Sequence, residues 1–260
     1  LKTFFYFCYY YKLILNTSAL TNQLHKYKTR RFREKLTKIP HAISYNLFGT
    51  ITGRLTTKKN SFPILTLDKD FRSVIKPKND FFVELDFNGA ELRCLLGLNE
   101  LPQPNEDIHM WNMEHVYKGA ITREESKKRI FAWLYNLESK DFLSNKAYAR
   151  DSLLEKYWDG ENITNPFGRQ IKSDKFHAIN FLIQSTSSDI FLRRAIEVSA
   201  ALKNKKSFTA ALIHDSMLID FSKEDKDLIP ELTRIFENTG FGKFKVNKKI
   251  GLDFGNMKEF

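Results

Sequence analysis

The chain has 260 residues, of which 42% are apolar and 14% aromatic, a composition that excludes a disordered tail and suffices for one large domain or two smaller ones. Lys and Arg outnumber Asp and Glu by 42 to 31, giving a net charge of +11. A surplus of this size suits a polyanionic partner, although many basic proteins bind no nucleic acid. Two cysteines, Cys8 and Cys94, cannot form a disulfide framework and match no metal-ligand spacing, so we expect two reduced, buried thiols in a cytosolic protein.

The first fifteen residues are rich in aromatic side chains but are interrupted by Lys2 and Lys12, so they are too short and too polar to span a bilayer. They also lack the basic start and clean apolar stretch of a signal peptide. Because the chain begins with Leu1 rather than Met, we expect it to be the C-terminal piece of something longer. Residues 1–40 are predicted to be helical, and the basic run at 26–33 is either a solvated helix face or a contact to a DNA backbone.

The next elements are a short strand and turn over residues 42–57 and a strand over residues 81–87, which is apolar and rich in β-favouring side chains. Asn88 is expected to cap the helix that follows, with Glu91 completing a capping box. Asp107 is expected to begin another helix.

A second capping box, at residues 122–125, predicts a helix whose first turn carries cationic side chains. Residues 160–169 contain Asn-Pro and Phe-Gly and are predicted to form a loop. Residues 177–202 are predicted to form a long amphipathic helix. Residues 210–221 are predicted to form two short strands with Asp215 at or near the turn between them.

Two acidic residues lie at the ends of apolar strands, Asp86 after the first and Asp215 in the tip of the hairpin. A carboxylate in such surroundings is costly unless it is paired or binds a metal. For either residue alone, a hydrogen-bonded turn or cap is the simpler interpretation. Together they fit a phosphoryl-transfer site in which two metal ions, about 3.5–4 Å apart, share carboxylate ligands.

The helix after Thr122 carries four side chains at intervals of four residues: Arg123, Lys127, Phe131 and Tyr135. They form a slanting stripe about 18 Å long, with cations near the positive end of the helix and aromatic rings near the other end. The stripe could grip a triphosphate and stack on a base, or it could belong to an ordinary amphipathic helix whose aromatic residues face a core. Its position between the two acids favours the first interpretation and predicts template-directed nucleotide addition.

From about Tyr45 to Met257 the chain resembles the family A DNA polymerases, the bacterial polymerase I type with its bacteriophage relatives. The resemblance rests on motifs in the family's order: Thr50-Ile-Thr-Gly-Arg54, Asp86 to Arg93 (D-x-x-x-x-E-L-R), Asp107-Ile-His109, the four-residue stripe (R-x-x-x-K-x-x-x-F-x-x-x-Y), Asn180 with Gln184, His214-Asp215 and Gly255-Asn256. Any one of these motifs is weak, but so many in the right order are a strong signal.

The resemblance implies catalytic roles for Asp86, Asp215 and Lys127, with the two aspartates holding two Mg²⁺ ions, for which Mn²⁺ could substitute. Glu91 would lie against the sugar and exclude a 2′-hydroxyl, so that deoxynucleotides would be preferred. The implied contacts to the incoming nucleotide also include Arg123, Lys127, His109, Phe131 and Tyr135. Those to primer or template DNA are Arg54, Asn180, Gln184 and His214. Without the motifs, His109 and His214 would be interpreted as structural histidines.

The chain departs from the family pattern at three positions. Ser216 stands where the glutamate of His-Asp-Glu is usual, and the related single-subunit RNA polymerases carry His-Asp-Ser; Glu91 argues against that alternative. Asn136 stands where glycine usually follows the stripe, and Gly89 lacks the polar side chain common at its position. The segment between the stripe and Asn180 is short for the family, so reduced fingers are expected.

We therefore expect an α+β fold: a right-hand polymerase palm, built on an antiparallel sheet with packed helices, plus helical fingers, with the thumb largely missing. The expected division is a thumb remnant (1–40), first palm segment (41–90), fingers (91–173) and second palm segment (174–260). The resemblance implies primer–template DNA and dNTPs as ligands, no membrane, a monomer in the bacterial or phage-infected cytoplasm, and proofreading or processivity supplied elsewhere. The alternatives are an RNA polymerase-like enzyme and a truncated fragment that binds primed DNA without catalysis.

Overall fold

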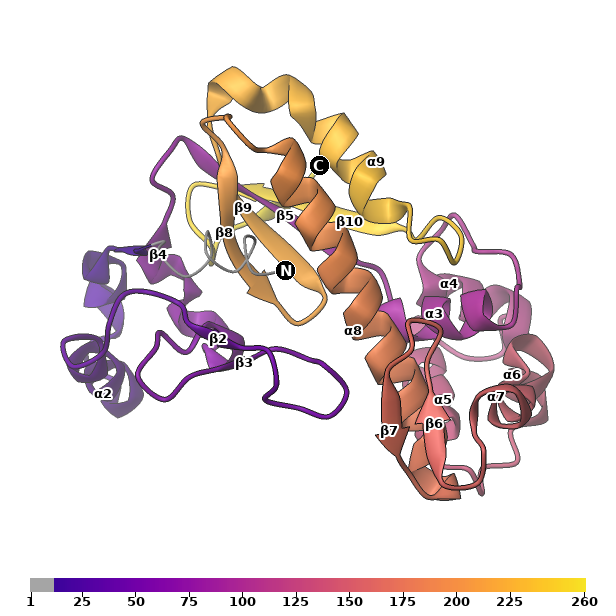
Figure 1. Ribbon diagram of the computed structural model, residues 1–260. Helices are drawn as coiled ribbons and strands as arrows, with labels where there is room; N and C mark the ends of the chain where they lie inside the picture. The colour runs from indigo at the N-terminus through magenta and orange to yellow at the C-terminus, as the bar shows by residue number, and fades with distance from the viewer. Residues whose placement is uncertain (1–11) are drawn as a thin grey trace.

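The computed structural model describes residues 12–260, so the expectation for Cys8 lies outside the described residues. The fold centres on an antiparallel sheet with the strand order β11-β10-β5-β9-β8 (Figure 1). Its strands are β5 (Phe81–Phe87), β8 (Phe208–Ile213), β9 (Ser216–Phe221), β10 (Val246–Gly251) and β11 (Lys258–Glu259). The predicted mixed fold with an antiparallel sheet is confirmed.

Strand β5 occupies the middle of this sheet because it is apolar and can be covered on both faces. It pairs with β9 on one side and with β10 on the other. The hairpin β8–β9 turns at His214 and Asp215, as predicted, and His214 adopts a positive φ of 55° to close the turn. The sheet thus carries the two predicted acids on neighbouring strands.

Helix α8 (Lys175–Ala201) is the longest helix of the described chain and begins where Asp174 caps it, two residues before the predicted start. It runs from the hairpin β6–β7 towards the sheet (Figure 1) and packs against α9 (Ile229–Glu237). On the sheet, the ring of Phe87 stacks on Phe236 of α9 with centroids 4.3 Å apart. The two helices therefore cover the sheet face that carries Phe87, whereas the face that carries Asp86 combines polar residues with buried apolar ones such as Phe82 and Leu218.

A group of short helices packs beside the lower part of α8 (Figure 1). Its elements are α3 (Ala90–Leu98), α4 (Ile108–Trp111), the π-helical turn η4 (Asn112–Val116), α5 (Arg123–Tyr135), α6 (Phe142–Tyr148), α7 (Arg150–Tyr157) and the strands β6 (Asn162–Thr164) and β7 (Gln170–Lys172). The predicted loop at 160–169 is wrong in part, because Ile163 and Ile171 are buried side chains of a hairpin. The Asn-Pro and Phe-Gly pairs mark only its turn.

The two predicted capping boxes differ in outcome. The Thr122 box is present: its side chain and that of Glu125 each accept from the other's backbone N–H. The Asn88 box is wrong, because Gly89 is the N-cap, with φ 63°, and no side chain caps α3. The Asn88 carboxamide turns away instead and accepts from the Ile108 backbone N–H at 2.8 Å.

The predicted helical character of residues 1–40 is correct only in part, because the described portion combines a short strand, a 3₁₀ helix and one α-helix. The elements on this side of the molecule are β1 (Ile14–Leu15), η1 (Thr17–Gln23), α2 (Tyr27–Leu36), β2 (Tyr45–Asn46), β3 (Thr56–Thr57), η2 (Ile64–Thr66), η3 (Lys69–Val74) and β4 (Ile75–Lys76). The 3₁₀ helix η5 (Lys223–Leu228) precedes α9. The division into thumb, palm and fingers segments stays a prediction.

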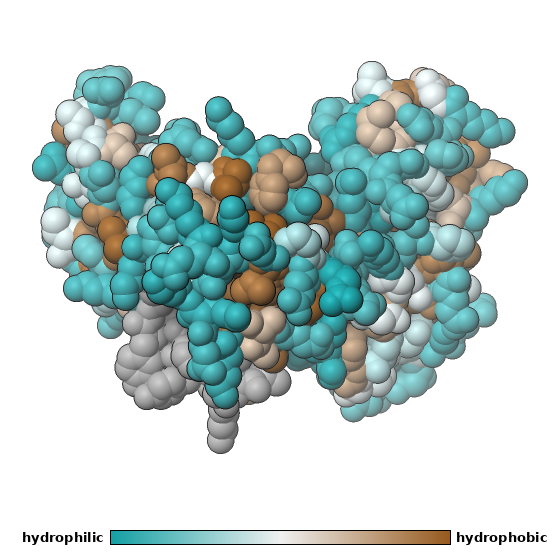
Figure 2. Space-filling view, turned by 90° about the horizontal axis from the view of Figure 1, so that it is seen from above, coloured by the Kyte–Doolittle hydropathy of each residue, from teal (hydrophilic) through white to brown (hydrophobic). Residues whose placement is uncertain are grey.

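Polar side chains cover most of the face shown in Figure 2, and hydrophobic side chains gather there only in small groups. Within residues 12–260, no helix combines the length and apolar character that a membrane crossing requires.

We predict that Gly89→Ala lowers the free energy of unfolding by about 2–4 kcal/mol, the sum of left-handed backbone strain and overpacking. A Cβ at this position would lie 2.3 Å from Cγ2 of Ile108. Gly119→Ala is the matched control, because Gly119 has φ 70° but no atom within 4 Å of its Cβ position. The control should cost only the strain, about 1–2 kcal/mol. Urea denaturation of both variants measures the difference, and equal losses would show that contact with Ile108 is unimportant.

Candidate active site

The two predicted acids come together at one end of the sheet. Asp86 lies opposite Ser216 in the β5–β9 pairing, and Asp215 directly precedes Ser216 in the turn. The Phe87 backbone N–H donates to the Asp215 carbonyl at 3.4 Å and holds the turn against β5. Residues separated by more than a hundred positions in the sequence are therefore neighbours, and both acidic side chains are half-buried.

The electrostatics of this pair favour a cation. Burial raises the pKa of Asp86 to about 7, and the negative charges of Asp215 and Glu84 contribute to the rise. Burial likewise raises the pKa of Asp215. Neither carboxylate forms an ion pair with a residue in the described part of the chain, and only the Asn247 amide donates to Asp86, at 3.4 Å. Two unneutralised carboxylates on adjacent strands are a donor set that Mg²⁺ or Mn²⁺ would fit.

A pocket of about 240 Å³ opens beside Asp215. Five of the predicted site residues line it: Arg54, Glu91, Phe131, His214 and Asp215. The rest of its wall consists of small or flat side chains that the sequence analysis did not select: Gly89, Ala90, Ser187, Ser188 and Phe191. One signal for the two serines was the run of four small polar residues at 185–188.

Glu91 joins three separate segments at this pocket. Its carboxylate accepts from the guanidinium of Arg54 and from the hydroxyl of Tyr135, the last residue of α5. Burial and the charge of Glu91 raise the pKa of Tyr135, while hydrogen bonding by Gln184 of α8 opposes the rise. The loop at 50–54, helix α3 and helix α5 are thus held together by one half-buried carboxylate.

The stripe on α5 faces outward, while the other side of the helix packs into the core through Trp133 and Leu134. The rings of Phe131 and Tyr135 stack with centroids 6.0 Å apart. Lys127 is exposed, and its ammonium group has no hydrogen bond or ion pair with any residue from 12 to 260. The helix therefore has a core-facing side, as one interpretation predicted, and a stripe that leaves Lys127 and Tyr135 exposed, whereas its binding role stays a prediction.

Arg123 and His109 lie close to the positive end of α5. The Arg123 guanidinium donates two hydrogen bonds to the Asp107 carboxylate, of 3.1 and 2.9 Å. Although burial opposes it, this contact lowers the pKa of the Asp107 carboxyl. His109 is 6% exposed, and its ring centroid lies 5.8 Å from that of Phe131. Burial lowers its pKa to about 4, so the ring is neutral at pH 7.

The remaining predicted contact, Asn180, is half-buried on α8, and its side-chain oxygen has no hydrogen-bond partner among the described residues. The structure does not bring it into the pocket beside Asp215.

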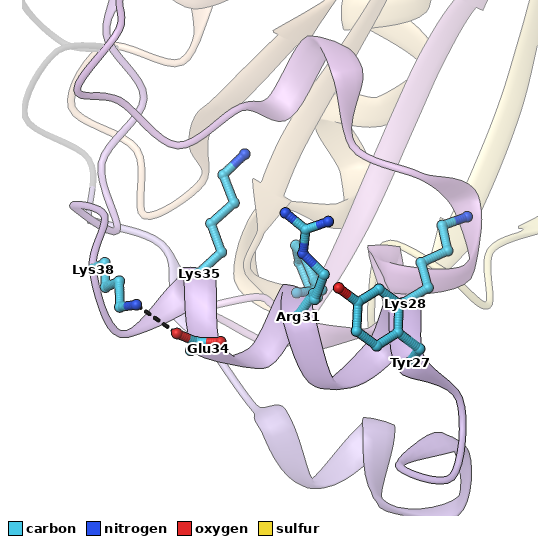
Figure 3. A pocket seen from close by; sticks show the side chains of 7 residues that line it. Tyr27, Lys28, Arg31, Glu34, Lys35 and Lys38 are labelled. Carbon is cyan, nitrogen blue, oxygen red and sulfur yellow. Dashed lines mark hydrogen bonds and ion pairs between the residues drawn. The ribbon is translucent and has the colours of Figure 1, made fainter.

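The basic run lies on α2, outside this pocket. Figure 3 shows Lys28, Arg31 and Lys35 extending from one side of the helix beside a cavity of about 490 Å³. Lys28 is neutralised by Asp68, whereas Lys35 is exposed and has no ion-pair partner in the described structure. Within the run, Arg30 also donates to the Leu24 and His25 carbonyls, so several of its cations are bound within the protein, and Lys35 lies just beyond it.

Comparisons with known proteins place these features in context. No family model matches the chain. It is 21% identical to the DNA polymerase I of Borreliella burgdorferi over 90% of its own length, and 25% identical to that of Caldicellulosiruptor bescii over 72%. It covers 31% and 28% of those proteins, so it spans about a third of the curated relatives it matches.

The fold is similar to a solved structure described as the POL domain of Pol1 from M. smegmatis in complex with DNA primer-template and dNTP. The TM-score is 0.69 at 14% identity, and the match covers 88% of this chain and 52% of the other. The resemblance to DNA polymerase I that the motifs predicted is confirmed in sequence, and the fold is that of a polymerase domain.

We predict that His109 makes the protein less stable in mild acid. Its pKa is about 4 when folded, against about 6.5 when unfolded, so the unfolded chain binds more protons between these values. Stability is therefore full above pH 6.5 and falls by up to about 3 kcal/mol as the pH drops to 4. In His109→Gln this slope should be shallower in urea denaturation series, whereas the exposed His25→Gln should leave it unchanged. An unaltered slope in His109→Gln would refute the assignment.

Proposed function

We propose that this chain is a DNA-directed DNA polymerase that adds deoxynucleotides to the 3′-hydroxyl of a primer paired to a template. One observation carries the proposal: Asp86 on β5 lies next to the turn that holds Asp215, and Asp215 lines a pocket together with Glu91 and Phe131. The similarity to DNA polymerase I supports the same reaction.

Asp86 and Asp215 would hold two Mg²⁺ ions, and Mn²⁺ could replace them. When bound, such ions lower the pKa of the attacking hydroxyl and offset charge on the departing pyrophosphate. The protein's own part is to hold both carboxylates in place before the substrates arrive. The backbone bond from Phe87 to Asp215 and the apolar packing behind β5 fix that arrangement.

The start of α5 would bind the triphosphate. Lys127 is free to pair with a phosphate oxygen and would hold positive charge against the leaving group, which is its proposed catalytic role. Arg123 would share its guanidinium between Asp107 and the triphosphate. His109, neutral and buried, would donate a hydrogen bond rather than a charge. The helix dipole adds to the attraction at this end.

The other end of α5 would frame the nascent base pair through Phe131 and Tyr135, whose rings are already stacked. Glu91 would stand beside the sugar, where Arg54 and Tyr135 fix its carboxylate. A 2′-hydroxyl would meet this carboxylate, so deoxynucleotides are the proposed substrates. Arg54, Asn180, Gln184 and His214 are proposed contacts to primer or template.

Nucleic acid would also be attracted by the net charge of +11 and by exposed cations of α2 such as Lys35. A monomer acting in the cytoplasm, with proofreading or processivity supplied by another protein, completes the proposal.

A second candidate, an RNA polymerase-like enzyme, is favoured only by Ser216, whose hydroxyl donates to Glu84. Extension of one primed template with NTPs and with dNTPs separates the two. A non-catalytic DNA-binding fragment would show salt-sensitive affinity and no product with either.

We predict that Asp215→Asn reduces magnesium-dependent primer extension by on the order of 10³-fold or more, because one of two metal-holding carboxylates is lost. Duplex affinity should stay within about twofold, since phosphate contacts elsewhere are retained. Asp227→Asn makes the same charge change at an exposed position and should extend normally. Near-normal extension by Asp215→Asn would exclude the metal role.

We predict that Glu91→Ala raises the incorporation of ribonucleotides relative to deoxynucleotides, by about 10-fold or more, because the carboxylate beside the sugar is removed. The measurement is the ratio of kcat/KM for NTP and dNTP on one template. Glu138→Ala, an exposed position of equal charge, is the control. If the ratio in Glu91→Ala equals that of the parent, Glu91 does not select the sugar.

A further inference from the structure

A third carboxylate lies on the same face of the sheet as Asp86. Glu84 precedes Asp86 by two residues on β5, and side chains two apart on a strand point to the same side. It is only 7% exposed. A buried carboxylate is costly unless its surroundings compensate the charge, so its presence beside Asp86 needs an explanation.

Two partners hold the Glu84 side chain. The Ser216 hydroxyl donates to its Oε1 at 3.3 Å, and Lys249 Nζ lies 3.4 Å from its Oε2. Ser216 is also the direct cross-strand neighbour of Asp86, and Lys249 pairs with Glu84 from β10. Glu84 therefore accepts a hydrogen bond from the residue that directly follows Asp215 and lies opposite Asp86.

The charge balance at this end of the sheet is negative. Glu84 and Asp86 on β5 and Asp215 in the adjoining turn supply three carboxylates, and Lys249 is the ion-pair partner of Glu84 in the described residues. Glu84 and Asp215 both act electrostatically on Asp86. Such a surplus disfavours folding of the empty protein but favours a divalent cation, whose affinity rises with the charge of its surroundings.

We propose that Glu84 is a positioning residue that sets the cation affinity of the Asp86–Asp215 site, by its charge and through its hydrogen bond with Ser216. This inference rests on the proposed function, because it concerns the same metal ions. Position 216 on β9, where a glutamate is usual, carries the hydroxyl of Ser216. The third negative charge near the two aspartates comes instead from Glu84 on β5. Lys249 opposes it and moderates the affinity.

The test is the binding of Mn²⁺ to the full chain without DNA or nucleotide, followed by electron paramagnetic resonance of the free ion. Glu84→Gln, which keeps the size of the side chain, should weaken Mn²⁺ binding by about 10-fold. This is the effect typical of residues that act on a metal site without binding the metal themselves. Lys249→Gln should strengthen binding, because it removes the opposing cation. The opposite signs distinguish a charge effect from a general loss of structure.

A double variant provides rescue. Ser216→Glu in the Glu84→Gln background returns a carboxylate to the same face and should restore most of the lost affinity. Thermal unfolding verifies that each variant is folded. If Glu84→Gln does not fold, Lys249→Gln still tests the proposal. The side chain of Lys249 is 35% exposed, so its replacement should disturb the core less.

The outcomes separate this inference from the proposed function. If Asp86→Asn abolishes Mn²⁺ binding while Glu84→Gln and Lys249→Gln match the parent, the role of Glu84 is refuted and the metal site stands. If the parent binds no Mn²⁺, or Asp86→Asn binds as the parent does, the metal site itself is refuted.

Discussion

The rest of this structure must compensate for the repulsion between Asp86 and Asp215. Two half-buried carboxylates on adjacent strands are unfavourable, and the chain maintains them by burying a continuous apolar surface behind the same strands. Phe87 and Phe236 stack directly behind the acidic end of β5. The free energy gained by burying these apolar side chains offsets the cost of holding the two carboxylates at the end of the sheet.

Glu91 is a further half-buried carboxylate, and it connects the surrounding helices. A single carboxylate accepts from Arg54 and from Tyr135, which belong to segments far apart in the sequence. These segments are therefore joined at Glu91 by polar contacts. Hydrogen bonds of this kind are exchangeable with those of a ligand, whereas the close-packed apolar side chains behind β5 have no such alternative partner.

Much of this arrangement could be predicted because its signals are local. The Thr122 capping box, strand β5 and the turn at His214 and Asp215 are each specified by residues adjacent in the sequence. The Asn88 cap failed for a tertiary reason, since the Ile108 backbone N–H competes for that side chain. The pairing of β10 with β5 and the contact between Glu84 and Ser216 join residues more than a hundred positions apart, and no local pattern encodes them.

The most direct test of the account is to locate Mn²⁺ by anomalous diffraction in crystals of the chain bound to a primer–template. The primer should have a 3′ end that cannot be extended. The account predicts density within about 2.0–2.6 Å of carboxylate oxygens of both Asp86 and Asp215. It would be contradicted if Mn²⁺ occupied only the exposed group of Glu106, Glu114 and His115, whose ligand atoms lie within 4.8 Å of one another, and left the two aspartates without an ion.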